Sequence, residues 1–299
     1  MNRYLFEVLC FIEKNGKKKY EIREISDSIQ ISGTMVSKCL EEAKEKGYIE
    51  GDSPLFITDF GLEVLEPYRV KKAVIMTAGF GSRMMPETAD KPKPMVTVNG
   101  KRIIDTLLDP LVSIGITDIT IVRGYKKERF DEILVQYPFV KFIDNDRYNK
   151  ENNISSAILA IDEINNCYLC EADLYITNPA IITKYQYVSN ILGSYSLETD
   201  DWSFQLDEHG HIRNYKKGNT YCYNYYGISY WTAEDSAKLR SDWSEIYKAN
   251  KDVFWEEVPL ILKKENYQVE IRQCNKQDIM EIDNYYELAQ LDETYRRDN

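Results

Sequence analysis

Residues 71–95 read KKAVIMTAGFGSRMMPETADKPKPM, and this stretch decides the fold. It begins with an apolar run at residues 73–76, which is typical of a buried strand. A glycine-rich segment that contains Arg83 follows directly, and Lys93 then stands between two prolines. Glycines immediately after a strand let backbone N–H groups approach a phosphate, and the two cations add positive charge. The stretch therefore predicts a strand followed by a loop that binds the phosphates of a nucleotide.

Two other kinds of glycine loop do not match this stretch. A P-loop closes its turn with Gly-Lys-Ser/Thr, which the stretch lacks. A dinucleotide-binding turn has a third glycine, whereas the residue three positions after Gly81 is Met84. The spacing Gly-x-Gly-x-Arg, followed by a proline and by Lys93 in a proline-rich turn, is therefore a pattern of its own.

This pattern resembles the signature of the nucleotidyltransferases that make NDP-sugars and CDP-alcohols. From about residue 70 to Leu291 the chain most resembles the bacterial CTP:phosphocholine cytidylyltransferases of the LicC type. The resemblance implies an α/β fold, a nucleoside triphosphate, Mg²⁺ and a phosphorylated acceptor. The implied reaction joins CTP and phosphocholine to give CDP-choline and pyrophosphate, by in-line attack of the acceptor phosphate on the α-phosphorus.

Strands and helices alternate after the phosphate loop. The pattern predicts a helix at 103–114, which Pro110 should kink, a strand at 117–122, a helix at 126–135, a strand at 139–143 and a helix at 154–164. Such alternation gives a largely parallel sheet with helices on both faces, and ligands bind at the carboxyl ends of its strands. We therefore expect residues 69–299 to form a nucleotidyltransferase domain with a Rossmann-like, mixed, mostly parallel sheet.

Two acids are candidate ligands of a divalent metal. The apolar run 168–170 leads into Asp173, and the short alternating run 280–282 leads into Asp283. Mg²⁺ prefers one or two carboxylates together with phosphate oxygens and water. The resemblance pairs Asp173 and Asp283 on one Mg²⁺. Asp283 could instead be only the N-cap of a helix that begins at Asn284.

The resemblance also implies which residues bind the nucleotide and which are catalytic. The implied nucleotide-binding residues are Ala78, Gly79, Phe80, Gly81, Ser82, Arg83, Gly124, Tyr125, Asn152 and Ser156. The implied catalytic residues are Arg83, Lys93, Asp173 and Asp283. Alternatives stay open, because Tyr125 could belong to a plain strand-to-helix turn, and asparagine and serine are ordinary helix caps.

The acceptor site is expected to be aromatic. A trimethylammonium group cannot donate a hydrogen bond, so aromatic faces and a distant negative charge must hold it. The resemblance to a choline pocket is best at Trp202 and Tyr230, with Trp255 and Glu256 as further candidates. Another phosphorylated amine, a phosphonate or a sugar 1-phosphate remains an alternative acceptor, and a sugar would require polar groups around its hydroxyls. Trp231 is expected in the core.

Residues 1–68 are expected to form a separate domain. Three helical stretches followed by a predicted hairpin and a last short helix resemble a small winged helix-turn-helix domain. DNA contact through the helix that begins near Thr34 is one interpretation. This segment carries more acidic than basic residues, which favours a docking or dimerisation module over DNA binding. A transcriptional regulator whose second domain senses a ligand is a further alternative.

Bulk properties limit the partners. The net charge of −11 argues against wholesale binding to nucleic acids or anionic membranes. No apolar run reaches the ~18 residues of a membrane span. The six scattered cysteines and the two histidines do not form a zinc pattern, so the chain is expected to be cytoplasmic and reduced. The sequence leaves homo-oligomer formation open.

Overall fold

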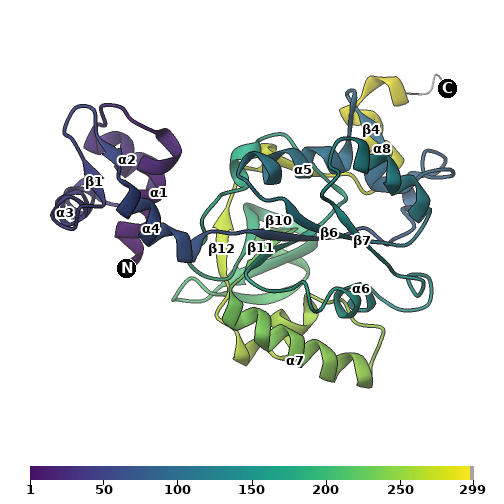
Figure 1. Cartoon of the computed structure of the whole chain (residues 1–299). Helices are drawn as coiled ribbons and strands as arrows, with labels where there is room; N and C mark the ends of the chain where they lie inside the picture. The colour runs from purple at the N-terminus through teal and green to yellow at the C-terminus, as the bar shows by residue number, and fades with distance from the viewer. Residues whose placement is uncertain (297–299) are drawn as a thin grey trace. The chain divides into compact units, whose positions relative to one another are not determined.

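A computed structural model of the chain describes residues 1–296 (Figure 1). It contains two compact units. The first unit comprises Met1–Arg69 and Lys184–Tyr187, and the second comprises Val70–Thr183 and the chain from Val188 onward. The sequence predicts that residues 69–299 form one domain. Residues Lys184–Tyr187 depart from that division because Tyr185 belongs to the apolar core of the first unit.

The first unit carries helices and one hairpin. Its elements are α1 (Arg3–Asn15), α2 (Ile22–Ile29), α3 (Gly33–Glu45), β1 (Ile49–Glu50), β2 (Phe56–Ile57) and α4 (Asp59–Leu65). Asn2, Ser32 and Thr58 cap α1, α3 and α4 by accepting hydrogen bonds from backbone N–H groups in the first turn. These elements follow the predicted order. Their assignment to a winged helix-turn-helix fold stays a prediction.

A mixed sheet forms the centre of the second unit. In the described residues its strand order is β12-β10-β11-β8-β3-β6-β7. The strands are β3 (Lys72–Met76), β6 (Asp118–Arg123), β7 (Lys141–Asp144), β8 (Cys167–Glu171), β10 (Asn190–Leu206), β11 (Ile212–Trp231) and β12 (Glu270–Gln273). Only β11 runs antiparallel to its neighbours β8 and β10 among these described strands. The expected α/β fold with a mixed, mostly parallel sheet is therefore confirmed.

Helices cover both faces of this sheet (Figure 1). Alternate residues of β3 enter different cores: Ala73 and Ile75 pack with α5 (Ile103–Ser113), whereas Val74 and Met76 pack with α6 (Ile154–Leu159) and α7 (Ala233–Ala249). This alternation is the two-residue period of a strand buried on both faces.

Three predicted helical segments need correction or qualification. The helix predicted at 103–114 forms as α5 (Ile103–Ser113), and the helix continues through Pro110. Residues Lys127–Val135 form a 3-10 helix rather than an α-helix. The helix predicted from residue 154 to residue 164 ends at Leu159. α8 (Tyr285–Leu291) and the short strands β4 (Thr97–Val98), β5 (Lys101–Arg102), β9 (Leu174–Ile176) and β13 (Ile279–Glu281) complete the second unit.

Candidate active site

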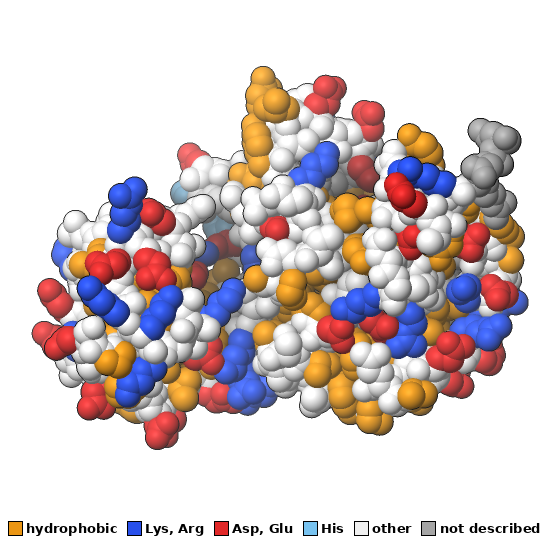
Figure 2. All heavy atoms as spheres, turned by 90° about the horizontal axis from the view of Figure 1, so that it is seen from above, with side chains coloured by type: hydrophobic (Ala, Val, Ile, Leu, Met, Phe, Trp, Pro, Cys, Tyr) orange, Lys and Arg blue, Asp and Glu red, His pale blue; other side chains and the backbone are white. Residues whose placement is uncertain are grey.

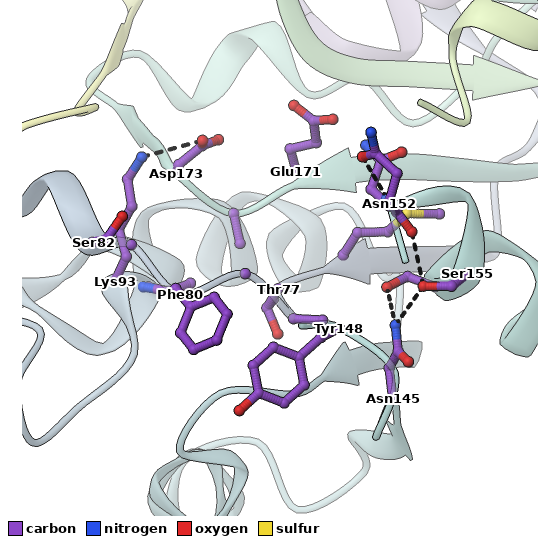
Figure 3. A pocket seen from close by; sticks show the side chains of 18 of the residues that line it. Thr77, Phe80, Ser82, Lys93, Asn145, Tyr148, Asn152, Ser155, Glu171 and Asp173 are labelled. Atoms are coloured by element: carbon purple, nitrogen blue, oxygen red, sulfur yellow. Dashed lines mark hydrogen bonds and ion pairs between the residues drawn. The ribbon is translucent and has the colours of Figure 1, made fainter. Parts of the chain in front are cut away.

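A cavity of about 450 Å³ opens at the carboxyl ends of β3 and β8. The two strands are parallel, and Met76 pairs with Glu171 in their register, so the loops that follow them leave the sheet side by side. Figure 3 shows Lys93 and Asp173 at one end of the cavity and Asn145 and Ser155 at the other. The cavity therefore has a charged end and an end of neutral polar groups.

The phosphate loop lies along the cavity and depends on one of its glycines. Residues 78–83 all line the cavity. Gly81 has φ +60°, and a Cβ built there would lie 2.9 Å from the Cβ of Lys93. Gly79 has no atom within 4 Å of the same position. Gly81 is therefore required both for the turn and for the close approach of Lys93.

This difference gives a matched pair of variants. Gly81→Ala is expected to lower kcat/KM at least tenfold, because the left-handed backbone and the contact with Lys93 must both change. Gly79→Ala meets no protein atom, so its loss of kcat/KM should be at least about threefold smaller than that of Gly81→Ala. Steady-state pyrophosphate release measures both. Equal losses in the two variants would contradict this account of the loop.

Two distant acids meet at the charged end. β13 pairs antiparallel with β9, which follows Asp173 directly, and the N–H of Ile282 donates to the carbonyl of Asp173 at 3.1 Å. This pairing brings Asp283 beside Asp173. Asp283 is not the helix cap, because the side chain of Asn284 accepts from the N–H of Glu287 and caps α8. We call Asp173 and Asp283 the acid pair.

Lys93 lies between the carboxylates of the acid pair. Its Nζ is 3.2 Å from an oxygen of Asp173 and 3.2 Å from an oxygen of Asp283. Arg83, which is largely exposed, approaches the other oxygen of Asp283 to 3.0 Å. Burial by itself would lower the pKa of Lys93, but the two carboxylates raise it above its ordinary value. Lys93 is therefore a fixed positive charge at the cavity wall.

The acids at this end suit a divalent metal. Asp173, Glu281 and Asp283 each have a carboxylate oxygen within 4.8 Å of the others. Oδ1 of Asp173 is buried and has no hydrogen-bond partner among the described residues. Burial, and then the charges of the acid pair, raise the pKa of Glu281 to about 9. An excess of hard oxygen ligands with one oxygen unpaired fits Mg²⁺, whose remaining positions phosphate and water would fill.

The neutral end is built around Asn145. Its side chain donates to Ser155 Oγ at 3.0 Å and to Ser156 Oγ at 2.9 Å (Figure 3). Asn152 also lines this end, as the resemblance implied, and its Nδ2 lies 3.3 Å from Asp252. No local pattern indicated Asn145 or Ser155, because a single polar residue after a strand or near the start of a helix is common in any fold.

Gly124 and Tyr125 do not line the cavity. The N–H of Tyr125 donates to the carbonyl of Ala78 at 3.1 Å, and its hydroxyl donates to the carbonyl of Thr88 at 3.0 Å. A Cβ on Gly124 would lie 2.7 Å from the oxygen of Ala78. The two residues therefore contact the phosphate loop at Ala78 without lining the cavity.

A largely buried group of acids and aromatic rings adjoins the cavity through Glu171, and we call it the acidic cluster. Its members are Glu171, Tyr215, Tyr225, Trp255 and Glu256. Glu171 lines the cavity wall. The hydroxyls of Tyr215 and Tyr225 are buried without hydrogen-bond partners among the described residues. Burial, and then the charges of Glu256 and Asp173, raise the pKa of Glu171. The cluster therefore holds two carboxyl groups that resist ionisation together, and its hydrogen bonding is incomplete.

The four residues expected to bind the acceptor occupy different places. Trp202 does not line the cavity, and it stacks on Tyr215 with ring centroids 4.8 Å apart. Trp255 and Glu256 belong to the acidic cluster but do not line the cavity, and Trp255 is fully buried in the core on the α7 side. Tyr230 does not, because its ring is buried in the core on the α5 side and its hydroxyl donates to Asn166 at 2.5 Å. Tyr230 is therefore a core residue, as is Trp231, which was expected in the core.

Comparisons with known proteins agree with this architecture. The family model for nucleotidyl transferases matches residues 72–188. A 2-aminoethylphosphonate cytidylyltransferase of Lancefieldella rimae is 36% identical over 75% of this chain and 92% of its own. A choline-phosphate cytidylyltransferase of Streptococcus pneumoniae is 29% identical over 76% of this chain and 100% of its own.

Solved structures give the same result. The CTP:phosphocholine cytidylyltransferase of Streptococcus pneumoniae superposes with a TM-score of 0.70 at 28% identity, covering 76% of this chain and all of that one. An inositol-1-phosphate CTP transferase of T. maritima shares the fold, with a TM-score of 0.61 at 16% identity over 76% of this chain and 94% of that one. Fold and cavity together define an enzyme that transfers nucleotidyl groups. The chain belongs to the nucleotidyltransferase family, and its relatives include cytidylyltransferases.

Proposed function

We propose that this enzyme joins CTP to a small phosphate or phosphonate that carries a cationic amine, and that it releases pyrophosphate. The observation that carries the proposal is the position of the acidic cluster beside the acid pair, and we take this cluster as the amine subsite. Glu171, on the cavity wall, is two residues from Asp173. An acceptor whose phosphate lay near Asp173 could therefore place a cation against Glu171.

The proposed chemistry needs no general base, because the phosphate or phosphonate of the acceptor is already an anionic nucleophile. Lys93, Arg83 and the loop amides would neutralise the phosphates and hold the acceptor oxygen in line with the α-phosphorus. The acid pair, with Glu281 beside it, would hold Mg²⁺, which withdraws charge from the phosphates when bound.

We propose 2-aminoethylphosphonate as the first acceptor to test. A primary ammonium donates three hydrogen bonds, and the amine subsite contains the carboxyl groups of Glu171 and Glu256 and two tyrosine hydroxyls that lack partners among the described residues. The relative with 36% identity is named for the same acceptor. Phosphocholine is the second candidate. Relatives of the chain support it, because the choline-phosphate cytidylyltransferase and the solved CTP:phosphocholine cytidylyltransferase of Streptococcus pneumoniae are named for this acceptor.

A pyrophosphate-release screen tests the proposal. CTP, UTP, ATP and GTP would each be combined with 2-aminoethylphosphonate, phosphoethanolamine, phosphocholine and glucose 1-phosphate in the presence of MgCl₂. We expect CTP to be preferred with an amine-bearing acceptor. Preference for glucose 1-phosphate would contradict the acceptor class, and preference for another nucleotide would contradict the base.

Glu256 provides a variant that separates the two substrates. Glu256→Gln should raise the KM for the amine-bearing acceptor about tenfold or more and leave the KM for CTP unchanged, since a charged hydrogen bond is typically worth about 1.5–3 kcal/mol. Burial raises the pKa of Glu256 to about 7. The carboxylate that attracts the cation is therefore lost as pH falls through 7.

The pH dependence checks the same assignment. In the wild-type enzyme the KM for the acceptor should decrease as the pH rises from 6 to 8. Glu256→Gln should lack the part of this decrease that comes from ionisation of Glu256. Ionisation of the acceptor itself is common to both proteins and cancels in the comparison. Identical pH profiles would contradict a charged role for Glu256.

For the first unit we propose a docking or dimerisation role. Lys44 and Lys46, on or directly after α3, pair with Asp52 and Glu42, so these cations are already partly neutralised. Figure 2 shows acidic and basic side chains interspersed on one face of this unit. DNA binding normally requires a basic face. A gel shift with the full chain on DNA at about 0.1 M salt is expected to be negative, and specific retardation would contradict the proposal.

A further inference from the structure

Asn145 is held in one orientation. It directly follows β7 and is almost fully buried. Its Oδ1 accepts a hydrogen bond from the backbone N–H of Arg147 at 2.9 Å. A backbone N–H can only donate, so the amide oxygen must face Arg147 and the NH₂ group must face the serines. Both N–H groups are then used, because they donate to Ser155 and Ser156.

The two serine hydroxyls that receive these bonds differ in one respect. The hydroxyl of Ser155 donates its proton to the carbonyl of Asn152 at 2.8 Å. Within residues 1–296, the hydroxyl of Ser156 has no acceptor for its own proton, although it is 3% exposed and lines the cavity. An unpaired O–H in a buried site is unfavourable, so a bound ligand is the natural acceptor. Ser156 therefore faces the ligand as a donor.

The nucleobase is the part of the nucleotide that fits this end. Lys93, Arg83 and the phosphate loop attract the triphosphate to the opposite end. The acid at the neutral end, Glu151, is already paired with Lys251 at 3.0 Å. Tyr148 and Phe80, with ring centroids 5.0 Å apart, add apolar area between the two ends (Figure 3).

We propose that Asn145 is a positioning residue that selects the base, by holding Ser156 as a hydrogen-bond donor toward a ring nitrogen that accepts. This inference rests on the proposed function. Cytosine N3 accepts a hydrogen bond, whereas N3 of uracil carries a proton and repels a donor. A free serine hydroxyl could turn to suit either base. Asn145 makes the donor orientation the favoured one and so contributes discrimination between CTP and UTP.

Asn145→Asp tests the inference. The aspartate can still accept from the N–H of Arg147, but its second oxygen accepts the proton of Ser156 and leaves a lone pair toward the base. We expect kcat/KM to fall about 10–100-fold for CTP and to stay level or rise for UTP, so the ratio of the two falls. Ser155→Ala, which leaves the contact between Asn145 and Ser156 in place, should keep the ratio within about twofold.

Further measurements keep the outcomes distinct. Equal losses with CTP and UTP in Asn145→Asp would overturn the inference and indicate a structural role. If that variant does not fold, Ser156→Ala replaces it, and an unchanged ratio there overturns the inference equally. If the wild-type enzyme releases no pyrophosphate from CTP with any acceptor, the proposed function fails. Calorimetric binding of CTP and UTP to the wild-type protein and to Ser156→Ala then still tests the base preference.

Discussion

Asp173→Asn is expected to abolish turnover, with kcat reduced at least 10³-fold at any Mg²⁺ concentration. The asparagine keeps the shape of the side chain but removes the negative charge and one ionic partner of Lys93. It also replaces the acid whose Oδ1 is buried and unpartnered, which is the oxygen best placed to accept a cation. Loss of a group that organises charge around the reacting phosphates typically costs several kcal/mol of transition-state stabilisation.

Two measurements separate this effect from a general loss of charge or of folding. Glu234→Gln removes an exposed carboxylate at the start of α7, paired with Lys238, and should leave kcat unchanged. Circular dichroism would show whether Asp173→Asn still folds. A folded Asp173→Asn enzyme that keeps more than a tenth of the wild-type kcat would contradict the assignment of Asp173 to the metal and phosphate centre.

Lys93→Met has the second-largest expected effect, and it should change two quantities in opposite directions. kcat should fall about 10²–10³-fold, because a preorganised charge at the phosphates is lost. The apparent affinity for Mg²⁺ should rise, because the acid pair no longer shares its oxygens with Nζ. The substitution also removes the ammonium group that lies between the two carboxylates of the acid pair. Stability without Mg²⁺ should therefore fall, by less than the about 3–5 kcal/mol typical of fully buried pairs.

The matched control is Lys101→Met. Lys101 pairs with Asp109 at the surface, where each side chain is about 40% exposed and such a pair contributes little. It should change neither kcat nor Mg²⁺ affinity. Titrating Mg²⁺ in activity and thermal-unfolding assays measures both quantities for Lys93→Met. A fall in kcat with weaker Mg²⁺ binding would contradict the geometry, because Lys93 would then support the metal site instead of competing with it.

Local patterns predicted the main elements of the fold. The apolar run at residues 73–76 became β3, and the alternation that follows it became parallel strands with helices on both faces. Boundaries were less predictable. α6 ends at Leu159 rather than near residue 164, and residues Lys127–Val135 are a 3-10 helix. Helix ends depend on caps and tertiary packing, which residue periodicity does not encode.

Some residues of the candidate site could be predicted from local sequence, and others could not. The residues of the phosphate loop line the cavity because they follow one strand directly, so their sequence order is also their spatial order. The residues expected to bind the acceptor come from separate segments, so their sequence order does not give their positions in space. Tyr230 and Trp255 lie next to family-like segments, yet Tyr230 faces the core, because the register of β11 against β8 decides where each of its side chains points.

The sequence by itself determined the α/β class, the phosphate loop with Arg83 and Lys93, and the two acids, since each is a short pattern attached to a strand. Tertiary structure alone decided that Asp173 and Asp283 share Lys93, because that depends on the pairing of β13 with β9. It also decided that the acid pair, Asn145 and the two serines, which come from separate segments, line one cavity. Such groups meet only after distant strands pair, and no local pattern records that pairing.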